Sequence, residues 1–385
     1  MIKVFFCTAI VFCFIFIPAL HIYSTDEPVR IGVSLSLTGR FSIMGNAQMN
    51  GFRLWERHVN ERGGILGRKV KIIIYDDKSG SETAKGLYEH MILKDKVDFV
   101  FGPYSSPITH AVLPIAEKYN YPLLISGGGA DSLWEKKYKN AIGVYTPSSR
   151  ISHGLIELFV RNNIKRIAIV HADDEYSTSV AKSANSWAKR LGLDVLLLEP
   201  FKKDTRDLTY LAKKVKDSGA EALIVGGHFN EAVDMRKALK IIDYYPNAYY
   251  ASVGAALEDY YLELRSDANY TFSSSLWELR ANFPGARKFH DDYLKIYQEP
   301  PQYHSALAYA GGQVLENAIN RSGSFDKEMV LDTLFKMDTI TIIGRYGIDR
   351  TGKQIRQHVF ITQWQKGKKE IVWPVELATA KPIFR

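Results

Sequence analysis

Residues 29–45 read VRIGVSLSLTGRFSIMG, and this stretch indicates the fold class of the chain. Its first part, Val29–Leu35, consists mostly of β-branched and apolar residues, which is typical of a buried strand. A glycine-containing loop follows and leads into a helical pattern over 46–61. Three large apolar residues of that pattern are spaced three and four apart and share one helical face: Phe52, Trp55 and Val59. A buried strand, a loop and an amphipathic helix in this order predict a unit of a parallel α/β sheet.

Strand and helix patterns alternate in two runs along the rest of the chain. The first run continues with strands at Val70–Tyr75, Val97–Phe101 and Pro122–Ser126 and with helices at Ser81–Leu93 and Ser106–Tyr119. The second run contains strands at Lys165–Val170, Asp194–Leu198, Ala222–Val225 and Ala248–Ser252, and helices at Ser177–Leu191, Leu208–Ser218 and Glu231–Ile241. Such alternation predicts two α/β lobes, each with a parallel sheet and crossover helices.

Extended pieces and turns surround these two runs. Residues 142–147 and 270–277 follow the first and second runs, and we expect them to connect the lobes. Helices are predicted at 286–297 and 305–320. The last segment is rich in turns, and its hairpin turns are expected at 349–352 and 365–368.

Length and composition restrict the classes of protein to consider. A chain of 385 residues predicts two domains, and 46% hydrophobic with 24% charged residues is enough to bury a large core. The net charge is +8, but basic and acidic residues are mixed along the chain. This mixture argues against a nucleic-acid-binding arm.

The first 24 residues have the pattern of a secretory signal peptide. Lys3 precedes a long apolar run, and cleavage is expected between Ala19 and Ser24. An uncleaved N-terminal anchor is the alternative, because the run is barely long enough to span a bilayer. Both cysteines, Cys7 and Cys13, lie in this leader, so the exported chain is expected to contain no disulfide.

The loops that follow the predicted strands contain the candidate binding residues, since ligands of parallel sheets lie beyond the carboxyl ends of the strands. Ser105 and Ser106 precede a helix, whose free N–H groups and dipole favour an anion such as a carboxylate. The alternative is that these serines only cap the helix. The run Gly127–Gly129 can expose bare backbone to a ligand. Several aromatic residues of these loops and connectors either stack on a ligand or pack in the core: Tyr104, Tyr145, Tyr176, Trp277 and Tyr303.

Motifs of catalysis and of cofactor binding are not found in the sequence. It contains no G-x-S-x-G, no H-E-x-x-H and no phosphate-binding glycine motif. His171, with Asp173, Asp174 and Glu175 after it, is a weak candidate metal site, because no second histidine stands at ligand spacing. We therefore expect neither an enzyme nor a bound metal or cofactor.

The order of these motifs resembles the leucine/isoleucine/valine-type periplasmic binding proteins of ABC transporters. The resemblance covers essentially the whole chain after the leader. It rests on Thr38-Gly39, Gly45, Asn60, Gly63-Gly64-Ile65, Gly67, Tyr75-Asp76-Asp77, Phe101-Gly102-Pro103-Tyr104-Ser105-Ser106, Arg166–Val170, Ile343-Gly344, Gln363-Trp364 and Trp373-Pro374.

The resemblance implies a type I periplasmic-binding-protein fold, with two lobes that are joined by a three-crossover hinge and close on a ligand. The implied N-terminal lobe comprises residues 26–146 and 276–344, and the implied C-terminal lobe comprises 147–272 and 345–385. The crossovers are expected near 145–148, 272–277 and 343–349. The implied role is periplasmic capture of a solute and its delivery, as a monomer, to an ABC-transporter permease.

The resemblance also implies which residues bind the ligand. Ser106 matches a serine that binds an amino acid's carboxylate, and Gly128 matches a position that offers backbone. Tyr176 matches an aromatic residue that closes over the ligand. The other implied positions are His228 at an aromatic position and Met44 in the first loop. Tyr104, with Met44 and Trp277, suits an apolar or aromatic body of the ligand.

Two residues depart from the pattern of the family. Ala130 stands where a hydroxyl residue usually holds the ligand's polar head, and Gly254 stands where amino-acid binders place the acid that pairs with the α-ammonium group. A buried, unpaired ammonium costs several kcal/mol. We therefore expect a small organic acid, an amide or an aromatic carboxylate. Branched-chain amino acids are the alternative ligands, with Asp131, Glu258 or Asp259 as the replacement acid. A role in ligand sensing is the alternative function.

Overall fold

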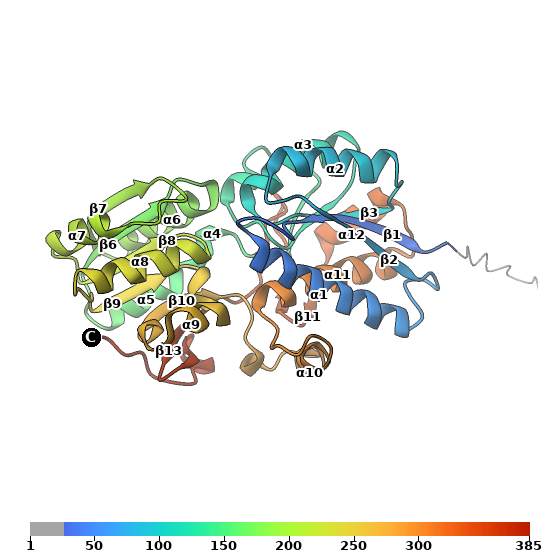
Figure 1. The fold of residues 1–385 in the computed structure, drawn as a ribbon. Helices are drawn as coiled ribbons and strands as arrows, with labels where there is room; N and C mark the ends of the chain where they lie inside the picture. Colours follow the sequence, from blue (N-terminus) through green and yellow to red (C-terminus); the bar gives the residue numbers. More distant parts are fainter. Residues whose placement is uncertain (1–26) are drawn as a thin grey trace, which may run out of the picture.

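The computed structural model describes residues 27–385 as two α/β lobes that lie side by side (Figure 1). The predicted leader, 1–24, lies outside the described residues. The expected fold class, two α/β lobes built on parallel sheets, is confirmed. No helix among the described residues is long and apolar enough to cross a membrane.

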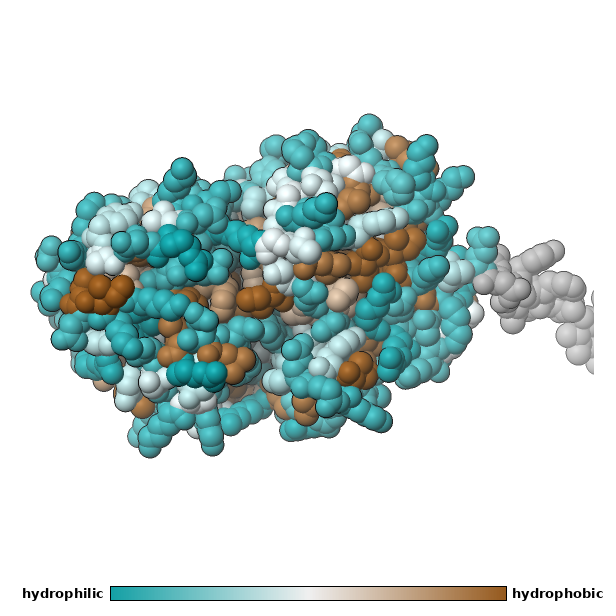
Figure 2. All heavy atoms as spheres, viewed as in Figure 1, coloured by the Kyte–Doolittle hydropathy of each residue, from teal (hydrophilic) through white to brown (hydrophobic). Residues whose placement is uncertain are grey.

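The first lobe is built on a five-stranded parallel sheet. Its strand order is β2-β1-β3-β4-β5, from β1 (Val29–Leu35), β2 (Val70–Asp76), β3 (Phe99–Phe101), β4 (Leu123–Ile125) and β5 (Ala141–Gly143). Its helices are α1 (Ser42–Glu61), α2 (Ser81–Leu93), α3 (Ser106–Lys118), α10 (Ala286–Tyr297), α11 (Tyr303–Ser322) and α12 (Lys327–Lys336). Helix α2 packs beside α3, and α1 packs beside α11. Along the edge strand β2, hydrophobic side chains gather at the surface (Figure 2).

The second lobe is built on a seven-stranded mixed sheet of order β14-β13-β10-β9-β8-β6-β7. The parallel strands are β6 (Arg166–Ala172), β7 (Asp194–Phe201), β8 (Ala222–Gly226), β9 (Ala248–Ala251) and β10 (Thr271–Ser275). The antiparallel strands are β13 (Phe360–Gln365) and β14 (Lys368–Trp373). Its helices are α4 (Ser148–Ile151), α5 (His153–Arg161), α6 (Glu175–Arg190), α7 (Thr209–Asp217), α8 (Phe229–Ile241) and α9 (Glu258–Leu264). Helices α5 and α6 cover one face of the sheet, and α7, α8 and α9 cover the other.

The structure differs from the sequence expectation at several elements. The second sheet is mixed rather than purely parallel, because the predicted hairpin at 365–368 adds two antiparallel strands to its edge. Lys366 and Gly367, at the tip of this hairpin, both have positive φ, as tight hairpin turns require. Helices α5 and α12 and the ribbon of β11 (Thr339–Thr341) and β12 (Gly344–Tyr346) are not expected from the sequence patterns.

Three segments of the chain pass between the two lobes: one after β5, one after β10 and one between β12 and β13. A single buried side chain, that of Gln357 in the third segment, joins them. Its Oε1 accepts a hydrogen bond from Thr146 Oγ1 at 2.6 Å, and its Nε2 donates to the Leu276 carbonyl at 2.8 Å. The predicted three-crossover hinge is therefore present as one hydrogen-bonded unit.

Helices α1 and α11 approach each other closely because glycine stands at their contact. A Cβ atom on Gly312 would lie 2.1 Å from Cδ2 of the fully buried Trp55 ring. The Trp55 Nε1–H donates to Glu316 Oε2 at 3.1 Å, which holds the indole in place. The core of the first lobe thus depends on the absence of a side chain at Gly312.

We expect Gly312→Ala to lower the free energy of unfolding by about 1–3 kcal/mol, since an added methyl forces the packed ring to shift. The matched control is Gly86→Ala in α2, where a Cβ atom meets nothing within 4 Å. Alanine favours a helix over glycine by up to about 1 kcal/mol, so the control should be neutral or stabilised. Urea unfolding measures both. Equal stability of the two variants would contradict the packing argument.

Candidate functional site: the contact between the lobes

The carboxyl ends of the strands in the two sheets face each other, and the loops that follow them meet. The Tyr104 hydroxyl, after β3, lies 2.9 Å from His228 Nδ1, after β8. The Phe41 ring packs against both, with centroid distances of 5.3 Å to Tyr104 and 5.1 Å to His228. A narrow cavity lies at this contact, lined by Tyr104, Ser105, Ser106, Gly127, Tyr145, Tyr176 and His228, and in this closed form it has no room for a water molecule. The lobes are therefore closed on each other at this contact.

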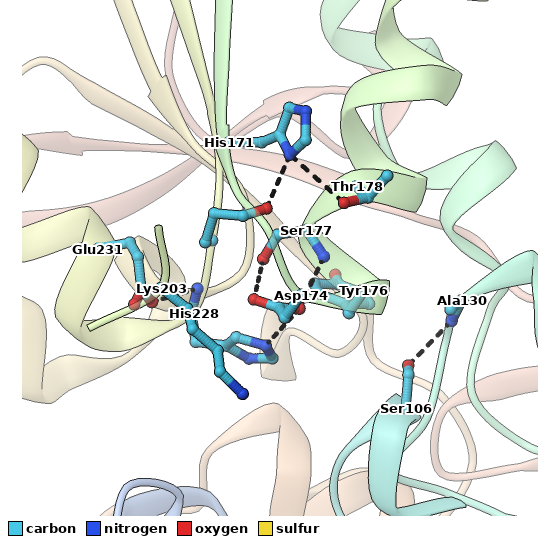
Figure 3. Close-up of polar contacts among 12 residues, drawn as sticks. Ser106, Ala130, His171, Asp174, Tyr176, Ser177, Thr178, Lys203, His228 and Glu231 are labelled. Carbon is cyan, nitrogen blue, oxygen red and sulfur yellow. Dashed lines mark hydrogen bonds and ion pairs between the residues drawn. The ribbon is translucent and has the colours of Figure 1, made fainter. Parts of the chain in front are cut away.

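The wall from the first lobe presents two serine hydroxyls at the start of α3. Ser106 Oγ accepts hydrogen bonds from the N–H groups of Gly129 and Ala130, both at 3.0 Å (Figure 3). A hydroxyl has two acceptor sites and one donor, so Ser106 keeps its hydrogen for another partner. Ser105 Oγ is buried and has no hydrogen-bond partner within residues 27–385. Neither serine caps α3, since the N-cap residue Ser105 makes no side-chain capping bond.

The wall from the second lobe centres on Asp174, His228 and Tyr176 (Figure 3). Asp174 is the N-cap of α6 and accepts from the N–H of Ser177 at 3.0 Å and from its hydroxyl at 2.7 Å. His228 Nε2 lies 3.4 Å from Asp174 Oδ1. Burial alone would raise the pKa of Asp174, but His228 and the Ser177 bonds outweigh it and hold that pKa well below its usual range. Asp174 is therefore an ionised, fully engaged carboxylate.

Two side-chain contacts join the rims of the two lobes beside the cavity. Arg40, from the first loop, bonds Glu231 at the start of α8 at 2.6 Å and also contacts Asp204. On another rim, His110 Nδ1 lies 2.7 Å from Glu175 Oε1. Glu231 is 2% exposed, so its carboxylate is buried, and Arg40 is the cation that pairs with it.

The structure places four of the eight predicted site residues on the cavity wall: Tyr104, Ser106, Tyr176 and His228. The other four are buried but do not line the cavity. Met44 packs in the first-lobe core, and Ala130 meets Ser106 through its backbone. A Cβ on Gly128 would face Thr109 and Leu133, and one on Gly254 would face the His228 carbonyl. The binding roles of all eight residues stay predictions.

Sequence analysis did not single out Arg40 and Glu231 as site residues. It named Asp174 only in the weak metal candidate and Tyr145 only as one aromatic among several. The position of Asp174 directly before a helix is an N-cap signal. Arg40 and Glu231 are 191 residues apart, and nothing local in the sequence pairs them.

The weak metal candidate is not assembled. His171 Nδ1 contacts the Ala172 carbonyl at 2.7 Å and Thr178 Oγ1 at 3.5 Å (Figure 3). Asp173 accepts from the backbone N–H of Lys203 instead. Within the part of the chain that the structure describes, no group of three or more His, Cys, Asp and Glu side chains is arranged to hold a metal ion.

We expect Arg40→Gln to open the lobes. Hydrogen bonds to a charged group contribute about 1.5–3 kcal/mol, and without Arg40 the buried Glu231 is relieved by opening to water. Small-angle X-ray scattering should show a larger radius of gyration. The matched control is Arg62→Gln, whose partner Glu316 belongs to the same lobe. An unchanged radius for Arg40→Gln would mean that the pair does not hold the lobes together.

A second prediction concerns His304, a fully buried side chain in α11 beside Tyr104. Burial, with a smaller effect of His228, lowers the pKa of His304 to about 3, against about 6.5 in an unfolded chain. Between these values the unfolded chain binds more protons, so stability falls as pH falls, by up to about 1.4 kcal/mol per pH unit. His304→Asn should flatten this slope in urea unfolding between pH 7 and pH 4.5, and the exposed control His358→Asn should not. Equal slopes in all three proteins would contradict the burial argument.

Comparison with known proteins agrees with this architecture. The periplasmic binding protein family matches residues 28–369. The Leu/Ile/Val-binding protein homolog 7 of Brucella suis is 24% identical over 370 residues, which cover 90% of this chain and 91% of the relative.

Two solved structures show the same fold. The branched-chain amino acid binding protein LivJ of Streptococcus pneumoniae, in complex with isoleucine, has a TM-score of 0.83 at 21% identity and covers 93% of this chain and 100% of its own. A solute-binding protein of R. palustris in complex with benzoate has a TM-score of 0.80 at 14% identity and covers 90% of this chain and 96% of its own. These structures have the type I fold, and the members of the family are binding proteins rather than enzymes. The match over residues 28–369 shows that this chain belongs to the periplasmic binding protein family.

Proposed function

We propose that this protein is the exported binding component of an ABC-type uptake system. Between its two lobes it captures a small organic ligand, which is an amino acid, an amide or a carboxylate. Aromatic ligands are included. The closed, loaded form is what a membrane permease receives. The leader directs the chain to the periplasm, where it acts as a monomer.

One observation carries this proposal: unsatisfied hydrogen-bonding groups are buried where the lobes meet. Ser105 Oγ has no partner among the described residues, and the Ser106 hydroxyl has a hydrogen to donate. Buried polar groups without partners are rare and costly in folded proteins. Since both serines line the cavity between the lobes, a ligand at this position would satisfy their hydroxyls.

The connection between the lobes supports capture by hinge bending. We place the lobe boundaries at 26–146 with 276–344 and at 147–272 with 345–385, so that three crossovers lie between them. Gln357 ties the three crossovers together at their centre. A rotation about this unit would separate Tyr104 from His228 and open the cavity without disturbing either sheet.

The relatives support the class of ligand. The relatives with sequence similarity are named for leucine, isoleucine and valine, and the two solved structures contain isoleucine and benzoate. One fold therefore serves both an amino acid and an aromatic carboxylate, and this fold alone does not choose between them.

A thermal-shift screen tests the proposal. The panel contains leucine, isoleucine, valine, phenylalanine, short amides, benzoate and aliphatic carboxylates. A ligand at a hundred times its dissociation constant should stabilise the protein by about 2.7 kcal/mol. Ser105→Ala should weaken that ligand about 10-fold to 100-fold, because a hydrogen bond to a charged or polar ligand group is lost.

The ligand-free Ser105→Ala protein should be at least as stable as the parent, since the substitution removes an unsatisfied buried hydroxyl. The matched control is Ser186→Ala on the exposed face of α6. A panel without any hit, or a hit that Ser105→Ala leaves unchanged, would count against capture at this cavity.

A further inference from the structure

No acid lines the cavity among the described residues. The acids nearest to it already accept hydrogen bonds from the protein. Asp174 Oδ1 accepts from the Ser177 N–H and faces His228, and its Oδ2 accepts from the Ser177 hydroxyl. Glu231 Oε1 binds Arg40 and its Oε2 accepts from the His228 N–H at 3.0 Å. Both oxygens of each acid are therefore held by protein groups.

The acids farther from the cavity are engaged as well. Asp131 accepts from Ser148, Ser149 and Lys353, and Glu175 accepts from His110 and Ser132. The other two acids that the sequence offers as replacements lie elsewhere. Asp259 accepts from Gln302 at 2.8 Å, and Glu258 is half-exposed beside Lys369. None of these carboxylates is free to bind an ammonium group in the cavity.

The backbone prevents an acid at Gly254. A Cβ atom there would lie 2.4 Å from the His228 carbonyl oxygen, 2.7 Å from its carbon and 2.8 Å from the Phe229 Cα. All three are main-chain atoms at the start of α8, so they cannot move aside as a flexible side chain would. The glycine is a packing requirement of this loop, and the loop has no place for an acidic side chain.

The opposite wall offers hydrogen-bond donors. The Ser106 hydroxyl has its hydrogen free, and the unpartnered Ser105 hydroxyl is 1% exposed. Both stand at the N-terminus of the 13-residue helix α3, where the helix dipole favours an anion. The remaining wall is largely aromatic, from Tyr104, Tyr145 and Tyr176, all buried.

We propose that the ligand of this cavity is a small carboxylate without an α-ammonium group, with its carboxylate at Ser105 and Ser106 and its apolar or aromatic body among the three tyrosines. This inference rests on the proposed function and narrows its ligand class. A carboxylate satisfies the donors of the first-lobe wall. An ammonium would be buried where no acid of residues 27–385 lines the cavity.

Matched ligand pairs test this selectivity. Isothermal titration calorimetry at pH 7 compares 4-methylpentanoate with leucine and 3-phenylpropanoate with phenylalanine. The members of each pair share a carbon skeleton and a carboxylate, and differ in the α-ammonium group. We expect at least one deaminated acid to bind at least 100-fold more tightly than its amino acid. The amide 4-methylpentanamide should bind more weakly than 4-methylpentanoate, because a carboxylate makes the stronger bonds to hydroxyl donors.

Each result decides between named alternatives. If leucine or phenylalanine binds as tightly as its deaminated partner, the inference is wrong and the proposed capture of a small ligand stands. If only the amide binds, the carboxylate assignment is wrong, and capture again stands. If no probe binds at millimolar concentration, the inference is overturned. A screen of the wider panel with no hit would then overturn the proposed function too.

Ser105→Ala tests where the carboxylate of the ligand binds. It should weaken the bound acid about 10-fold to 100-fold and leave the ligand-free stability unchanged or higher. Ser186→Ala on the exposed face of α6 should change neither quantity. Tight binding of the acid that survives Ser105→Ala unchanged would place its carboxylate elsewhere and contradict the inference.

Discussion

Parallel strands need crossover connections, and this constraint places the site. Each strand of the first sheet, and five strands of the second, run in one direction with helices on both faces. Their carboxyl ends, and the N-termini of the helices that follow, therefore gather at one edge of each sheet. Because the two lobes turn these edges toward each other, Ser105 and Ser106 before α3 come to face Tyr176 and His228.

The closed contact pairs its buried acids with basic side chains. Glu231 meets Arg40 across the lobes, and Asp174 meets His228 within the second lobe. Burying an unpaired ion would cost several kcal/mol, so a buried carboxylate needs such a partner. The described residues that line the cavity itself include two serines and no acid.

One side chain joins the three crossovers of the hinge. Gln357 is the only side chain of the described residues that the structure shows bonded to both Thr146 and Leu276, in the two other crossovers. Its amide carries an acceptor and donors, so one residue joins three backbone segments. The sheets can remain rigid while the lobes rotate about this point, as is expected of a hinged binding protein.

The succession of elements could be predicted from the sequence, because periodicity is local. Strand β1 and helices α2 and α10 have the bounds that their patterns predict. The position of Ser106, Tyr104, Tyr176 and His228 at the contact between the lobes could also be predicted, since they stand after strands whose carboxyl ends meet there. Met44, Gly128, Ala130 and Gly254 also follow strands but do not line the cavity, because which of these residues face it depends on the packing around them.

What the sequence alone determined is therefore the order of strands and helices, the two-lobed class and the loops that carry the site. Only the tertiary structure decided which loop residues reach the cavity and which charges cancel. Arg40 and Glu231 are separated by 191 residues, and Thr146 and Gln357 by 211. Contacts of such separation leave no local pattern in the chain. They arise only when the folded lobes bring the residues together.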